Sequence, residues 1–266
     1  MKKVMFLLCA AAFLAVACDK EEPAPTPENP ANPSDTTQVD PSEEVFIPNA
    51  VADIDGNSYD AVRIGEQVWM ASNLRTTRYA NGDAIPEGGE NSSATAPYRY
   101  QSTSTTDLSS YGYLYNWPAV MHGASSSSSN PSGVQGVCPN GWHVPSDVEW
   151  SELTAYCSGH TECVCSGDGN KIAKSLAADH DWQITTGECA VGNDLSSNNI
   201  TGFSALPAGV YAGSYDFFGG RAYFWSATEY SSSYAYSRYL SYNYAGVSPH
   251  SNYYKDAGYS VRCVRD

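Results

Sequence analysis

The sequence predicts an α+β domain built from small twisted antiparallel sheets, with two helices, long loops and disulfide staples. Three observations lead to this fold class. Short β-prone segments separated by Gly, Ser and Asn recur along the second half of the chain, two helical patterns stand out among them, and six cysteines lie in the same part. Residues 45–266 contain no Pro-rich linker, so we expect a single domain there.

The first 17 residues are typical of an export signal. Two lysines precede an apolar run, residues 4–16, which is too short to span a bilayer comfortably. The run ends in LAVAC, which resembles a bacterial lipobox with alanine where leucine is usual. We therefore expect removal of residues 1–17 and lipid attachment at Cys18, with a plain secretory signal as the alternative.

Residues 18–44 are rich in Pro, Glu, Thr, Asn and Asp and have almost no apolar side chains. Burial there cannot offset the entropy of ordering, so we expect a disordered tether, kept extended by its prolines. The acidic start of the tether resembles the surface-export signals of Bacteroidetes lipoproteins, and a simple solvated start of the tether is the equal alternative. The stretch DTT resembles an O-glycosylation acceptor and marks Thr36. These features predict a lipid-anchored outer-membrane protein exposed at the cell surface.

The charge of the chain excludes one class of partner. Without the two lysines of the signal, 12 basic residues face 29 acidic ones, a net charge of −17. Such a chain does not bind nucleic acid by neutralising phosphates. We expect contact with the membrane through the N-terminal lipid only.

The six cysteines beyond the lipid site favour three disulfides, because an exported chain meets an oxidising environment. Zinc is the competing interpretation for four of them. Neither a C-x-x-C pair nor a histidine at ligand spacing supports it, so we expect no metal. From spacing alone the pairing stays open among Cys138, Cys157, Cys163, Cys165, Cys189 and Cys263.

The domain is expected to begin with a β-hairpin over residues 50–64 and a strand over 68–70. The turn of the hairpin is Asp55-Gly56-Asn57, a sequence that favours tight reversal. A calcium loop is the alternative for these residues. The position that would need a bidentate Glu is occupied by Ile64, so the turn is preferred.

Two helices are expected. Ser146 and Glu149 form a capping box, after which Trp150, Leu153 and Cys157 fall on one helical face. The second helix is expected over residues 170–178. The remaining expected strands are 203–206, 223–228, 234–244 and 259–265.

Six ordered motifs, DIDGNSYDAVRIGEQVWMASNL, YGYLYNW, GVCPNGWHVPSDVEW, GFSALPAG, FWSATE and GYSVRCVRD, resemble the Fibrobacter succinogenes major paralogous domain. The resemblance covers essentially all of residues 50–266. It implies a C-type-lectin-like fold, in the branch that includes formylglycine-generating enzymes. It also implies the disulfides Cys138–Cys263, Cys165–Cys189 and Cys157–Cys163.

The resemblance brings no known activity with it. Cys263 matches only the terminal structural Arg-Cys of formylglycine-type enzymes, and the calcium-dependent sugar-binding motifs of lectins are missing. The histidines are scattered, and His143 is interpreted as a packed residue. We expect no enzyme and no cofactor. A cell-envelope polysaccharide hydrolase using Asp179, Asp181, Glu188 or Asp194 is the less favoured alternative.

Ten of the 20 tyrosines lie in residues 221–266, among Ser, Asn, Ala and Gly, which is the composition of a binding surface. Alternation along residues 234–244 predicts that the face carrying Leu240 is buried. We expect an unknown glycan or protein ligand to contact Trp225, Tyr236, Tyr239, Tyr242, Tyr244, Tyr253 and Tyr254.

The segment 230–254 also resembles the variable regions that diversity-generating retroelements rewrite, often on C-type-lectin-like folds. Adenine mutagenesis of asparagine-type codons yields the residues that crowd this segment. The alternative function is that of a structural or fimbrial component of the cell envelope.

Overall fold

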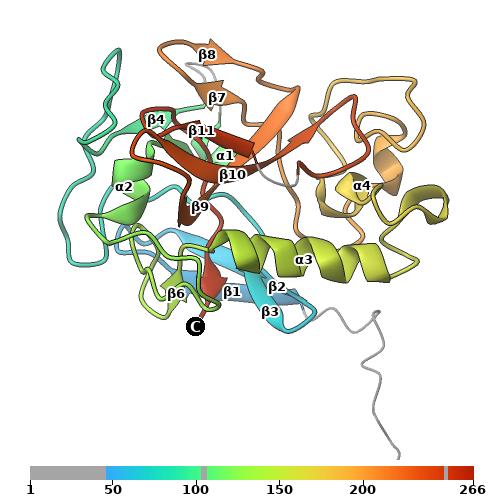
Figure 1. The fold of residues 1–266 in the computed structure, drawn as a ribbon, viewed down its shortest axis with the longest axis horizontal. Coiled ribbons are helices and arrows are strands. Elements are labelled where there is room, and N and C mark those ends of the chain that lie inside the picture. The colour runs from blue at the N-terminus through green and yellow to red at the C-terminus, as the bar shows by residue number, and fades with distance from the viewer. Residues whose placement is uncertain (1–45, 103–106, 249–250) are drawn as a thin grey trace, which may run out of the picture. The chain divides into compact units, whose positions relative to one another are not determined.

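The computed structural model describes residues 46–102, 107–248 and 251–266, all of which fall in one compact unit, Asp40–Asp266. Cys18, Thr36 and the segments 1–17 and 18–44 lie outside these described residues. The described strands form four antiparallel sheets and alternate with short helices, so the predicted α+β class is confirmed (Figure 1). Within this part of the chain, no helix is both long and apolar enough to cross a membrane.

The largest sheet has the strand order β1-β2-β3-β12-β6. It opens with the predicted hairpin of β1 (Phe46–Ala52) and β2 (Ser58–Ile64), followed by β3 (Gln67–Met70). At the turn, Oδ1 of Asp53 accepts from the backbone N–H groups of Asp55 (3.0 Å) and Asn57 (2.9 Å). Its Oδ2 accepts from the Tyr59 hydroxyl at 2.6 Å. These bonds stabilise the turn that the sequence predicted.

A disulfide closes this sheet. Cys138 precedes β6 (Trp142–His143), and Cys263 precedes β12 (Val264–Arg265), which pairs with both β3 and β6. The bond joins residues 125 apart in sequence, as predicted. On the chain-entropy model, such a long closure stabilises the fold by about 5 kcal/mol.

Helix α3 (Asp147–Gly159) is the long helix of the described chain, and it starts at the predicted capping box. The Ser146 hydroxyl accepts from the Glu149 N–H at 3.2 Å, and Glu149 accepts from the Ser146 N–H at 2.8 Å. The Trp150 ring lies 4.6 Å from Trp69 of β3 and 5.6 Å from Phe224 of β9 (Arg221–Glu229). The helix therefore lies between the two larger sheets (Figure 1).

The second sheet has the order β11-β10-β9, with β10 (Tyr234–Ser241) in the middle and β11 (Ser251–Tyr254) at one edge. The prediction of a single buried face on β10 was incomplete. Arg238 and Leu240 are buried on the side of α3, yet Ser237 is buried on the opposite side. Layers of side chains cover both faces of this strand, so alternation alone could not tell the faces apart.

Other sequence-based elements were also wrong in extent: the strand expected over 259–265 is limited to β12, Val264–Arg265, and the strand expected over 234–244 ends at Ser241. The second helix, α4, spans only Ala173–Leu176, because the chain then turns extended and Ala177 bridges to Ala205. Residues 203–206 do not form a strand. Ser204 has φ +56°, and the carbonyls of Phe203 and Ser204 accept from the buried guanidinium of Arg262 rather than from a neighbouring strand.

Several short elements were not predicted. Among the described residues, the helices α1 (Leu108–Tyr111) and α2 (Trp117–Met121) raise the number of α-helices from the expected two to four. The small two-stranded sheets and the 3₁₀ turns complete the fold. They are β4 (Arg99–Gln101) with β5 (Tyr113–Tyr115), β7 (Val210–Tyr211) with β8 (Tyr215–Asp216), η1 (Cys165–Gly167) and η2 (Leu195–Ser197).

The Cys165–Cys189 disulfide is present as predicted and closes a shorter loop, with 24 residues of separation. The third predicted pair has a different status. Its two residues, Cys157 and Cys163, are both buried in the core cluster around Trp150. Their pairing stays a prediction.

Candidate ligand-binding surface

One residue of the predicted contact set belongs to the core. The Trp225 side chain is 1% exposed, its ring lies 4.5 Å from that of Tyr259, and its Nε1–H donates to the Tyr115 carbonyl at 2.7 Å. The assignment of Trp225 as a ligand contact is therefore corrected. A tryptophan whose ring and N–H are both satisfied internally has nothing left to offer a ligand.

The remaining predicted tyrosines are divided among three places. Tyr239 and Tyr253 lie on the side of the β9-β10-β11 sheet that faces Tyr259 and the buried residues packed around it. The Tyr239 ring lies 5.4 Å from Tyr223, whose hydroxyl accepts from Arg221 at 2.8 Å. Tyr253 is 40% exposed at the edge, whereas Tyr239 is half-buried. The side chains on this side of the sheet mainly pack against the core.

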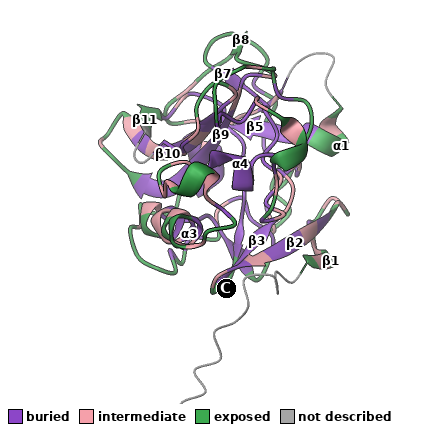
Figure 2. Ribbon diagram, turned by 90° about the vertical axis from the view of Figure 1, so that its right-hand side faces the viewer, coloured by how far each residue is buried: buried purple, intermediate pink, exposed green. Residues whose placement is uncertain are grey.

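The opposite side of the same sheet carries a partly exposed cluster that we call the tyrosine face. It consists of Tyr230, Tyr234, Tyr236, Asn252 and Tyr254. Register places Tyr234 opposite Tyr254 and Tyr236 opposite Asn252, so these side chains project together. Tyr230 and Tyr254 are 55% and 53% exposed. In Figure 2, β9 is mostly buried and β11 is more exposed.

The rings of the tyrosine face are arranged in two pairs. Tyr230 and Tyr236 meet edge to face at 5.4 Å, and Tyr234 and Tyr254 lie 4.5 Å apart. Each ring limits the motion of its partner, so the face is held in place before any ligand arrives. Such ordering lowers the entropy cost of binding.

Helix α3 covers only part of this side of β10 and leaves the beginning of the strand uncovered. Arg238 is 1% exposed, and its guanidinium pairs with the Asp147 carboxylate and donates to the Ser151 hydroxyl at 3.1 Å. These contacts fasten the first turn of α3 over the middle of β10. Tyr234 and Tyr236 precede Arg238 on the same side of the strand and lie beyond the start of the helix.

Tyr242 and Tyr244 belong to a different region, next to the Cys165–Cys189 disulfide. The Tyr242 carbonyl accepts from the Gly192 N–H at 2.7 Å, and the Tyr244 carbonyl accepts from the Val191 N–H at 3.3 Å. The Tyr244 side chain is 52% exposed, whereas that of Tyr242 is half-buried. The structure therefore does not bring these two residues together with the tyrosine face.

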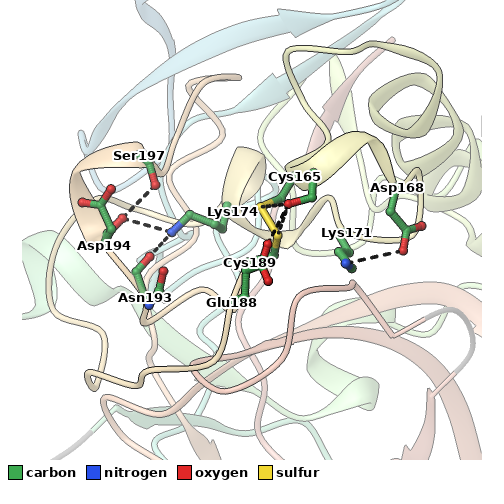
Figure 3. The surroundings of a disulfide bond; sticks show 10 residues. Cys165, Asp168, Lys171, Lys174, Glu188, Cys189, Asn193, Asp194 and Ser197 are labelled. Atoms are coloured by element: carbon green, nitrogen blue, oxygen red, sulfur yellow. Dashed lines mark hydrogen bonds and ion pairs between the residues drawn. A yellow bond between two sulfur atoms is a disulfide. The ribbon is translucent and has the colours of Figure 1, made fainter.

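A buried lysine holds this neighbouring region together (Figure 3). Lys174 is 8% exposed, and its ammonium donates to the backbone carbonyls of Asn193 and Asp194, at 3.0 Å for Asp194. Burial lowers the pKa of Lys174. The other side of the loop is fixed by Cys189 and by the Ser166 hydroxyl, which donates to Glu188 at 3.0 Å. These contacts order the loop.

A second polar network surrounds His143. Its Nδ1 lies 2.7 Å from Oδ1 of Asp266, and its Nε2 lies 2.6 Å from Oε1 of Glu149. Burial alone would lower the pKa of His143, but the contacts with Glu149 and Asp266 outweigh it and raise that pKa. The imidazole is 2% exposed, in agreement with its interpretation as a packed residue.

Of the carboxylates considered for hydrolysis, Asp179 and Asp181 share a contact with His180, at 2.7 Å and 3.9 Å, and the others have separate partners. Asp181 also accepts from the Tyr111 hydroxyl at 2.7 Å. Glu188 binds Ser166, and Asp194 accepts from the Ser196 hydroxyl at 2.6 Å. A search of the described residues finds no group of three or more His, Cys, Asp or Glu side chains able to hold a metal ion.

Residues 62–265 match the Fibrobacter succinogenes major domain. The chain belongs to this family. The Fibrobacter succinogenes major domain thus extends from β2 to β12 and includes both disulfides, helix α3 and the tyrosine face. No curated protein and no solved structure matches the chain. Membership of the family assigns no ligand, and the likeness to C-type lectins stays a prediction.

The sequence-based contact set does not include three residues of the tyrosine face, Tyr230, Tyr234 and Asn252. Tyr230 lies in the turn after β9, and Tyr234 begins β10. A signal for Tyr234 was available. Tyr234 lies two residues before Tyr236 in the strand, so alternation places both side chains on one face.

Proposed function

We propose that this chain is an exported, lipid-anchored surface protein whose Fibrobacter succinogenes major domain binds a glycan or protein ligand without catalysing a reaction. The observation that carries the proposal is the tyrosine face. Tyr230 and Tyr254 expose more than half of their surface, and each is held by a neighbouring ring. Tyrosines offer a large rigid surface with one hydroxyl each, and an exposed cluster of them is typical of binding sites.

The buried polar groups support binding over catalysis. Each nitrogen of His143 contacts a carboxylate, and one of these carboxylates, that of Glu149, also accepts from the Ser146 N–H. General acid–base catalysis needs such a group within reach of a substrate. At 2% exposure, His143 acts instead as a link between the last strand and the start of α3.

The N-terminal sequence supports the anchor. Cys18 in the lipobox-like motif is the proposed lipid site, and the Pro-rich segment that follows would hold the domain away from an outer membrane. Metabolic labelling with an alkyne fatty acid tests this assignment. The label should enter the wild-type chain and be lost in Cys18→Ala. Protease treatment of intact cells should then release the domain if it is surface-exposed.

We further propose a C-type-lectin-like arrangement and retroelement diversification of residues 230–254. The exposed tyrosines of this segment support the second idea, because exposed side chains tolerate substitution better than the core does. Genome sequence around the coding region provides the test. A neighbouring reverse transcriptase with a near-repeat of this segment would support diversification, and the absence of both would reject it.

Binding itself is tested on arrays. The full chain, solubilised in mild detergent, is applied to glycan and surface-protein arrays beside Tyr230→Ala/Tyr254→Ala. The wild type should bind a defined subset that the double variant loses. If the wild type binds nothing and instead assembles into fibres, the alternative of a structural component replaces this proposal.

A further inference from the structure

Strand β11 forms an open edge of the β11-β10-β9 sheet. Among the described strands it pairs with β10 alone. Its residues Asn252, Tyr253 and Tyr254 are all exposed. An edge strand presents a row of unpaired backbone N–H and C=O groups, to which another chain can add as a further strand.

The pairing register decides which backbone groups of β11 face outward. The Lys255 N–H donates to the Ser233 carbonyl at 3.0 Å, so the odd-numbered residues of β11 direct their backbone groups toward β10. Asn252 and Tyr254 therefore direct theirs toward the free edge. The Tyr254 carbonyl already accepts from the Ala257 N–H at 3.0 Å. The edge thus offers a partner the N–H and C=O of Asn252 and the N–H of Tyr254.

Strand β11 itself lacks the features that usually protect an edge from pairing. Natural edge strands carry outward lysines, prolines or bulges. Residues 251–254 contain no charge and no proline, and they pair with β10 without a bulge. The next residue, Lys255, is 6% exposed, and its Nζ lies 4.4 Å from the Trp117 ring centroid and 3.2 Å from Glu229. Its charge is turned inward and does not guard the edge.

We propose that this edge binds an extended segment of a partner protein, which adds to the sheet as a further strand beside β11. The inference rests on the proposed binding function of the tyrosine face and names its partner. Alternate side chains of the added strand would continue the tyrosine face next to Asn252 and Tyr254, where aromatic and β-branched side chains pair well. In this mode of recognition, backbone bonds supply the affinity and side chains supply the specificity.

Other occupants fit the edge less well. A glycan has no regular row of N–H and C=O groups to match that of β11. Two copies of the chain would repel each other through their net charge of −15. A stable protein–protein interface also buries roughly 800 Å² per partner, more than the pairing of such a short strand provides. The partner is therefore a flexible segment, and we expect it to lack acidic residues.

Panning a displayed library of random short peptides on the full chain, solubilised in mild detergent, tests the proposal. The library should yield β-prone peptides, whose Kd is then measured with synthetic peptides by fluorescence anisotropy. Asn252→Pro removes an outward N–H and keeps those directed toward β10, so the affinity should fall at least about tenfold. Asn252→Ala is the matched control. It loses the same side chain but keeps the N–H, so its affinity should stay within about threefold of the wild type.

N-methylation of the selected peptide gives a second test that leaves the protein unchanged. Only every other N–H group of an added strand faces β11. Methylation of one alternate set of backbone nitrogens should therefore abolish binding, whereas methylation of the other set should be tolerated.

Three results would overturn the proposal: the library yields no peptide that binds the wild-type chain, Asn252→Pro binds the peptides as the wild type does, or the two methylation patterns have equal effects. These failures can be told apart from failure of the proposed function. Glycan binding without any selected peptide would support the tyrosine face and reject the edge. Peptide binding that is lost in Tyr230→Ala/Tyr254→Ala but kept in Asn252→Pro would lead to the same conclusion.

Discussion

His143 of β6 and Glu149 of α3 are joined by a 2.6 Å contact between Nε2 and Oε1, and both side chains are 2% exposed. Asp266 accepts on the other side of the imidazole at 2.7 Å. When the ring is protonated, both nitrogens donate to carboxylates. The contact ties the five-stranded sheet to the capping box of α3, so the start of the helix depends on the charge of one histidine.

The first prediction concerns pH. The contacts with Glu149 and Asp266 raise the pKa of His143 above 6.5 despite burial, so folding favours the protonated ring. The stabilisation is therefore complete below about pH 6.5 and is lost as the pH rises through the raised pKa. Urea denaturation at pH 6 and pH 9 should show a larger drop in unfolding free energy for the wild type than for His143→Gln. Equal drops in the two proteins would contradict this account.

The second prediction ranks the two disulfides. Cys138–Cys263 closes a separation of 125 residues and Cys165–Cys189 one of 24, so the first restricts the unfolded chain more. Removing the first by paired Ala substitutions should cost about 5 kcal/mol, and removing the second about 3.5 kcal/mol. Denaturant titration of both double variants shows which one loses more unfolding free energy. A greater loss from the shorter closure would show that loop entropy does not govern these bonds.

The third prediction concerns Arg262, which is buried completely. Its guanidinium donates to the Asn73 side chain at 2.8 Å, the Met70 carbonyl at 3.0 Å and the Ser204 carbonyl at 2.8 Å. A lysine ammonium cannot reach acceptors in this planar arrangement, so Arg262→Lys should cost about 2–4 kcal/mol.

Arg265 provides the matched control for this measurement. It is exposed three residues further along the chain, and Arg265→Lys should change the unfolding free energy by less than about 0.5 kcal/mol. Similar effects of the two substitutions would mean that the contacts of Arg262 contribute little.

Local sequence signals predicted the parts of the fold that depend on local bonds. The capping box of Ser146 and Glu149 gave the start of α3, and the Asp55-Gly56-Asn57 turn gave the first hairpin. Both features are completed within a few residues, so no distant partner has to be known. The signal for α2 is also local, with Asn116 as the cap and Pro118 in the first turn.

Elements that depend on distant partners could not be predicted in this way. Residues 203–206 have strand composition, yet the carbonyls of Phe203 and Ser204 bind Arg262 from the far end of the sequence. The second helix stops at Leu176 because Ala177 pairs with Ala205. In each case a tertiary contact overrides local propensity.

The candidate site illustrates the same limit. Composition marked the tyrosines of residues 221–266 as a group, but the fold divides them between the core, the tyrosine face and the region beside Cys189. Trp225 and Tyr254 belong to the same predicted contact set and have opposite exposures, 1% and 53%. Only the pairing register of β9, β10 and β11 places the first side chain in the core and the second at the surface.

The most direct test of the central claim is the affinity of the full chain for an array ligand, compared with that of two variants. Tyr230→Ala/Tyr254→Ala removes the exposed rings of the tyrosine face, and Tyr215→Ala removes a tyrosine of similar exposure, 44%, on β8. We expect the Kd to rise at least about tenfold in the double variant and to stay unchanged in Tyr215→Ala. An unchanged Kd in the double variant would contradict binding through the tyrosine face.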